Sequence, residues 1–94
     1  MIRGEIMKNG MAGTKESNDV LMTVTESKEL EIEIESIVYE FYGKQIEDTI
    51  RKTLNELGVS SIHVLCQDKG ALDHTIRSRL ITAVERFQRG EDSE

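Results

Sequence analysis

The stretch "ELEIEIES", residues 29–36, constrains the fold of this chain more than any other. Its leucine and two isoleucines alternate strictly with glutamates, and this period of two is that of a β-strand. The alternation predicts a strand with one face toward a core and the other in water. The domain must therefore contain a sheet, and a bundle made only of helices is excluded.

Two further segments have strand character. Residues 20–26, "VLMTVTE", and residues 61–66, "SIHVLC", alternate and are rich in β-branched side chains. The dipeptide "SK" at 27–28 indicates a tight turn, which predicts an antiparallel hairpin between 20–26 and 29–36.

Two helices are expected from apolar spacing of three and four residues. The first begins after Ser36, a possible N-cap, and ends at Gly58, a possible C-cap. The second covers 71–88. The expected apolar positions are Tyr39, Tyr42, Ile46, Ile50, Leu54 and Leu57 in the first helix and Leu72, Ile76, Leu80, Ala83, Val84 and Phe87 in the second.

The order β-β-α-β-α predicts an α+β two-layer sandwich. We expect a three-stranded antiparallel sheet in which 20–26 lies between 29–36 and 61–66, because the crossover through the first helix must be right-handed. Two helices then cover one face. The 94 residues suffice for one domain. Residues 1–19 are expected to be a flexible leader, 20–88 a single domain, and 89–94 a frayed tail.

The charge balance argues against several partner classes. The formal net charge is -6, with neither a basic stripe nor an aromatic stacking platform, so nucleic acid is not an expected partner. No stretch approaches a membrane span, and residues 1–13 lack the apolar run of a signal peptide, which predicts a cytoplasmic protein. An acidic protein of this size is suited to docking on basic enzyme surfaces.

The residues that could carry chemistry are few. Cys66 is the only cysteine, and its apolar neighbours predict a core position. The sequence spacing of His63 and His74 relative to Cys66 does not match a metal-binding motif, so no metal site is expected. No Ser-His-Asp arrangement, phosphate loop or dinucleotide fingerprint occurs, so no catalytic residue is expected in the chain itself.

Ser17 lies in "AGTKESND", residues 12–19, a stretch of turn-forming residues. The residue is either a plain turn serine or an exposed hydroxyl to which a partner enzyme attaches a group. No base is placed beside it in the sequence, so the partner would have to supply one. "DKGALD", residues 68–73, is favoured as a plain helix start, with a weak alternative as an anion site.

Together, "AGTKESNDV" (12–20) and "DKGALDHTIRSRL" (68–80) resemble the acyl carrier protein, or gamma subunit, of citrate lyase, and the resemblance extends from about residue 12 to residue 87. It implies that Ser17 carries a covalently attached phosphoribosyl-dephospho-CoA group. The thiol of that group would hold acetyl and citryl thioesters during cleavage of citrate to acetate and oxaloacetate.

The resemblance also implies partners. They are the citrate lyase alpha subunit, which exchanges acetate for citrate, the beta subunit, which cleaves the citryl thioester, a prosthetic-group transferase and a citrate lyase ligase.

Two alternatives stay open. One is the carrier subunit of malonate decarboxylase, which uses the same kind of group. The other is an adaptor domain that never carries a group.

Overall fold

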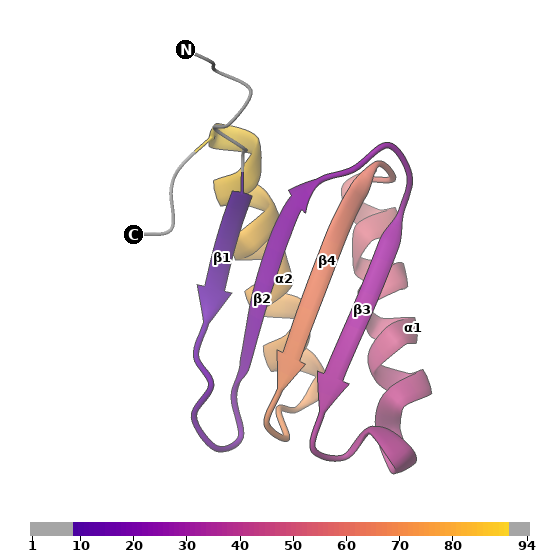
Figure 1. Ribbon diagram of the computed structural model, residues 1–94, viewed down its shortest axis with the longest axis vertical. Helices are drawn as coiled ribbons and strands as arrows, with labels where there is room; N and C mark the ends of the chain where they lie inside the picture. Colours follow the sequence, from indigo (N-terminus) through magenta and orange to yellow (C-terminus); the bar gives the residue numbers. More distant parts are fainter. Residues whose placement is uncertain (1–8, 91–94) are drawn as a thin grey trace.

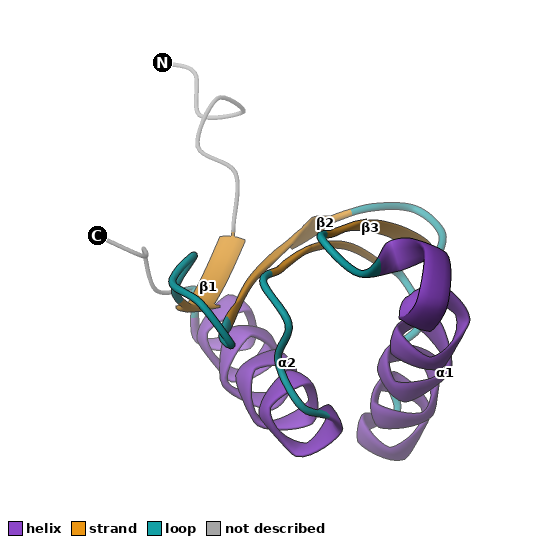
Figure 2. Ribbon diagram, turned by 90° about the horizontal axis from the view of Figure 1, so that it is seen from below, coloured by secondary structure: helices purple, strands orange, loops and turns teal. Residues whose placement is uncertain are grey.

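The computed structural model describes residues 9–90, which form a four-stranded sheet and two helices (Figure 1). The helices both lie on one face of the curved sheet (Figure 2), so the expected α+β class with two layers is confirmed. The elements in chain order are β1 (Asn9–Gly13), β2 (Val20–Glu26), β3 (Glu31–Ser36), α1 (Tyr39–Leu57), β4 (Ile62–Asp68) and α2 (Asp73–Arg89).

The expected strand count and strand order are wrong. The sheet has the order β1-β2-β4-β3, so 62–68 rather than 20–26 lies between the other two expected strands. β2 pairs antiparallel with β1 and β4, whereas β3 pairs parallel with β4. β2 and β3 are therefore not a hairpin, and the sheet is mixed rather than antiparallel.

The β2–β3 connection explains this difference. It contains the four residues 27–30 and passes over the end of β4 (Figure 1), whereas the expected turn had two residues. Skipping one strand requires a lateral step of about 10 Å, and four extended residues can span about 13 Å. The helix α1 then provides the long crossover that a parallel β3–β4 pair needs.

β1 lies inside the segment expected to be a flexible leader. It pairs with β2 from Asn9 opposite Thr25 to Gly13 opposite Leu21 and packs on α2. Its three central residues, "GMA", are poor in β-branched side chains, so the sequence pattern did not reveal it. Residues 1–8 of that leader and residues 91–94 of the expected tail lie outside the described part.

The core lies between the sheet and the helices and confirms most of the expected apolar positions. It is formed by Val20, Met22 and Val24 of β2, Ile62, Val64 and Cys66 of β4, Ile46, Ile50 and Leu54 of α1, and Ile76, Leu80, Ala83 and Val84 of α2, with Ala12 of β1. Four of the expected apolar positions are exposed instead of buried: Tyr39, Tyr42, Leu57 and Leu72. Ser36 is not the N-cap of α1, a position that Val38 occupies, and Gly58 ends that helix in the left-handed conformation as expected.

Burial makes Cys66 unreactive. The side chain is fully buried, and loss of solvation raises the pKa of its thiol to about 12. Because the thiolate is the reactive form, we expect no reaction with a disulfide reagent at pH 8 in the folded protein and one thiol per chain after denaturation. Counting thiols before and after adding guanidinium checks this, and rapid labelling of folded protein would contradict it.

Candidate functional site

Three loops meet at one end of the molecule, below the sheet in Figure 1. They are the β1–β2 loop at 14–19, the β3–α1 link at 37–38 and the β4–α2 loop at 69–72. The carboxyl ends of β1, β3 and β4 point to this end. The sequence stretches around Ser17 and around Gly70 therefore lie side by side.

Ser17 occupies the turn of the β1–β2 loop, and its side chain is exposed. Asn18 follows it with a φ of 65°, a left-handed conformation that asparagine tolerates better than most residues. The Asp19 amide donates to the Glu16 carbonyl at 3.1 Å and closes the turn around Ser17. The hydroxyl is thus presented at the tip of a defined turn.

The Ser17 loop is fastened to the neighbouring loop by backbone hydrogen bonds. The Asn18 amide donates to the Lys69 carbonyl at 2.8 Å, and the Lys69 amide donates to the Asp19 carbonyl at 2.9 Å. These two bonds continue the β2–β4 pairing beyond Asp68. The base of the loop is therefore tied to the end of β4.

Asp19 anchors the loop to α2. Arg79 donates two hydrogen bonds to its carboxylate, from Nε to Oδ1 at 3.1 Å and from Nη2 to Oδ2 at 2.8 Å. The Thr14 hydroxyl donates at 2.8 Å and the Val20 amide at 2.7 Å. These donors, Arg79 first, hold the pKa of Asp19 at about 2, below its usual 3.8.

Replacing Asp19 by Asn is expected to lower the free energy of unfolding by about 1 kcal/mol at pH 7, a value discounted because Arg79 is partly exposed. A carboxyl group whose pKa is lower in the folded state stabilises the fold at pH values above its unfolded-state pKa. This stabilisation is lost as the pH falls through the pKa of the folded state. The difference between wild type and Asp19→Asn should therefore shrink between about pH 4 and pH 2. Urea denaturation across this range measures it, and a pH-independent difference would contradict the anchoring role.

Asp68 organises the β4–α2 loop. Its carboxylate is 2% exposed and accepts hydrogen bonds from the Ser36 hydroxyl at 2.7 Å, the Gly70 amide at 3.1 Å and the Ala71 amide at 2.9 Å. The Ser36 hydroxyl in turn accepts from the Val38 amide at 3.1 Å. One buried carboxylate thus fixes both loops beside the Ser17 loop, and the "DKGALD" stretch is a built turn in which the Lys69, Gly70 and Ala71 amides already donate within the protein.

The other candidate residues lie away from this end or are not assembled into a site. His63 lies on the sheet face without helices, 3.4 Å from the Thr25 hydroxyl and 3.6 Å from a Glu33 carboxylate oxygen. His74 is exposed in the first turn of α2. Within residues 9–90, no three His, Cys, Asp or Glu side chains are grouped to hold a metal ion, and no helix is long and apolar enough to cross a membrane.

Sequence reasoning did not assign a role to Arg79, Thr14 or Asp19. Asp19 and Arg79 are 60 residues apart, so no local spacing relates them. The signal that could have found them was the joint occurrence of the two stretches quoted above, because one contains Asp19 and the other Arg79. The structure shows that the two stretches are in contact.

Comparison with known proteins gives a consistent picture. The family model described as malonate decarboxylase delta subunit (MdcD) matches residues 7–87. The fold is similar to a chain in the crystal structure of a Pseudomonas malonate decarboxylase hetero-tetramer in complex with malonate, with a TM-score of 0.63 over 87% of this chain and 82% of that one. The identity there is 14%, so this likeness concerns the fold alone.

Curated relatives are much more similar in sequence, and those named here are citrate lyase acyl carrier proteins. That of Halothermothrix orenii is 39% identical over 92% of this chain and 93% of its own. The protein of Haemophilus influenzae is 44% identical over 87% of this chain and 86% of its own length. The protein of Escherichia fergusonii is 43% identical over 87% of this chain and 87% of its own length. The family model spans the Ser17 loop and the β4–α2 loop. At these identities and coverages, this chain belongs to the citrate lyase acyl carrier protein family.

Proposed function

We propose that Ser17 is the attachment point of a phosphoribosyl-dephospho-CoA group, and that the chain serves citrate lyase as a non-catalytic, cytoplasmic carrier. The observation that carries this proposal is the exposed Ser17 hydroxyl at the tip of a turn whose base is anchored. An anchored turn holds the root of the arm at a constant place while the arm itself moves.

The surroundings of Ser17 suit a phosphodiester. Lys15 and Lys69 border a surface depression next to the loop, together with Glu35, Ser36, Ile37, Gln67 and Asp68. The two ammonium groups are matched there by two carboxylates, so a phosphodiester would meet a surface of mixed charge with cationic donors within it. The turn is open to solvent, so a large group can be accommodated without displacing core residues.

Attachment requires chemistry that this chain does not supply. The Ser17 Oγ would form a bond to phosphorus of an activated phosphoanhydride donor, the bond between that phosphorus and the leaving phosphate would break, and the hydroxyl proton would pass to a base. Neither loop, 14–19 nor 69–72, contains a histidine. The base therefore belongs to the transferase, which must close over the exposed turn.

When bound, the group supplies a thiol that forms acyl thioesters. The chain contributes by keeping that thiol near the active sites of the alpha and beta subunits, which raises its effective concentration. The ligase would act on the same thiol. Because Cys66 is buried, its own thiol does not compete for acyl groups.

The test is the intact mass of the chain after co-expression with the synthesis and transfer enzymes of a citrate lyase system. We expect an added mass equal to phosphoribosyl-dephospho-CoA, located on Ser17 by peptide mapping. The folded, modified chain should then show one reactive thiol, and the denatured chain two. An unmodified chain beside a modified relative would count decisively against the proposal.

A malonate decarboxylase carrier remains the second candidate, favoured by the family model. The two are separated by offering the modified chain to each set of catalytic subunits. We expect citrate cleavage with citrate lyase subunits and no malonate decarboxylation with the other set. The reverse result would exchange the two assignments and leave Ser17 as the attachment site.

A further inference from the structure

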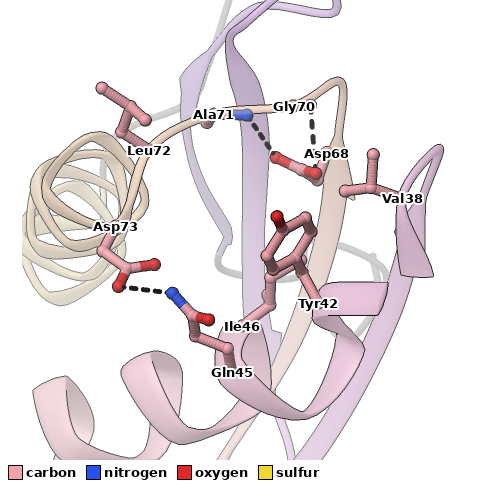
Figure 3. A pocket seen from close by; sticks show the side chains of 9 residues that line it. All are labelled: Val38, Tyr42, Gln45, Ile46, Asp68, Gly70, Ala71, Leu72 and Asp73. Atoms are coloured by element: carbon pink, nitrogen blue, oxygen red, sulfur yellow. Dashed lines mark hydrogen bonds between the residues drawn. The ribbon is translucent and has the colours of Figure 1, made fainter. Parts of the chain in front are cut away.

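A pocket of about 360 Å³ lies between the start of α1 and the β4–α2 loop (Figure 3). Ile46 and Ala71 lie along it, and the ring of Tyr42 rises from α1 toward the loop formed by Asp68 and Gly70. One side is closed by a hydrogen bond of 2.9 Å from Gln45 to Asp73, which links the two helices.

The mouth of this pocket is unusually apolar for exposed surface. Tyr42 is 51% exposed and Leu72 66%. The large hydrophobic side chains exposed in the described part gather around this end, with Leu57 the exception: Ile37, Tyr39, Phe41, Tyr42 and Leu72. Several exposed apolar side chains at one end of a small protein are typical of a binding surface.

The pocket borders the Ser17 loop. Gly70 lines it, and a Cβ atom on Gly70 would lie 3.6 Å from the Asn18 side-chain oxygen and 3.9 Å from Ile37. Asn18 directly follows Ser17 and is held to Lys69 by its amide. A group attached to Ser17 thus starts one residue before a side chain that lies beside the Gly70 wall of the pocket.

The charges select which part of such a group fits. Asp68 and Asp73 line the pocket and no lysine or arginine does, so an anionic citryl group would be repelled. A neutral, flat ring with polar edges is suited to Tyr42 and the surrounding polar atoms. In the arm attached through phosphoribose, the adenosine is the first such ring from Ser17, and the pantetheine and its thiol lie farther out.

We propose that this pocket binds the adenosine end of the group carried on Ser17, with the adenine against the ring of Tyr42. The inference rests on the proposed function. Holding the adenosine fixes the root of the arm, whereas the pantetheine remains free to reach the catalytic subunits. The phosphates between the two would stay outside the acidic pocket, toward the adjoining depression, where Lys15 and Lys69 lie with Glu35 and Asp68.

Tyrosine fluorescence offers a direct test, because the chain has no tryptophan and only two tyrosines, Tyr39 and Tyr42. In Tyr39→Phe, Tyr42 is the sole emitter, and we expect its emission to fall by about half or more on modification, because the docked state is the populated one. In Tyr42→Phe, where Tyr39 emits alone, the change should be small. Intact mass establishes modification of each sample.

Proton NMR of the adenine signals gives a second measurement on the modified chain, in which a bound adenine should give broad signals. Tyr42→Ala should narrow these signals toward the width seen for a free nucleotide. The matched control is Phe41→Ala, which removes an adjacent aromatic side chain, 80% exposed, that does not line the pocket; it should leave them broad.

The outcomes separate this inference from the function on which it rests. A modified chain with unquenched Tyr42 and narrow adenine signals overturns the pocket assignment and leaves the carrier function standing. A chain that cannot be modified at Ser17 overturns both. Quenching that disappears with the Tyr42 substitution, together with broad adenine signals that only Tyr42→Ala narrows, supports the assignment.

Discussion

Replacing Ser17 by alanine is expected to abolish citrate cleavage by the assembled lyase while the domain stays folded. The substitution removes the oxygen that would bond to the prosthetic group, so no acyl group can be tethered. Tethering makes each encounter with an active site intramolecular, a gain of about 10²–10⁴ in avidity, so turnover should fall by about a thousandfold or more without it. Because the side chain is exposed, the free energy of unfolding should change by less than about 0.5 kcal/mol.

The measurement combines three readouts on one sample: intact mass, thermal unfolding and citrate cleavage with the catalytic subunits. Ser60→Ala is the matched control, because Ser60 is also exposed and lies in the α1–β4 link. It should be modified and active. Full activity of Ser17→Ala would instead favour the adaptor alternative, in which this serine is only a turn residue.

Replacing Gly10 by alanine is expected to have the largest effect on stability. A Cβ atom at this position in β1 would lie 2.1 Å from the Ala83 carbonyl oxygen and 2.5 Å from the Phe87 amide nitrogen, both backbone atoms of α2. Backbone cannot swing aside as a side chain can, so β1 must separate from α2. We expect a loss of about 2–3 kcal/mol in the free energy of unfolding.

For a domain of this size, such a loss lowers the Tm by roughly 8–24 °C. Met11→Ala is the control in the same strand, because Met11 alternates to the other sheet face, and it should cost about 1 kcal/mol or less. Hydrogen exchange would show faster exchange of β1 amides in Gly10→Ala. An unchanged Tm would mean that β1 does not pack closely on α2.

The local features of the fold were predictable because they depend on short-range periodicity. The alternation at 31–36 made β3 with exposed glutamates, and the spacing of Ile46, Ile50 and Leu54 made the buried face of α1. Cys66 is buried as its neighbours indicated. Each of these follows from which residues share one face of one element.

Strand partners depend on longer-range effects. The side chains of β4 are alternately buried and partly buried, as suits a central strand between β2 and β3. The outward side chains of β3 are exposed glutamates, which suit the edge of a sheet. A local reading of "SK" as a turn could not weigh this, because the competing strand is encoded more than thirty residues later.

The amino-acid sequence by itself thus determined the class of fold, the faces of its helices and strands, and the family to which the two loop stretches point. Only the tertiary structure decided that β1 exists, that Asp19 and Arg79 hold the Ser17 turn in place, and that a pocket lined by Tyr42 adjoins it. These are contacts between residues far apart in the chain. Their free energy comes from burial and hydrogen bonding that exist only after the chain has closed its loops.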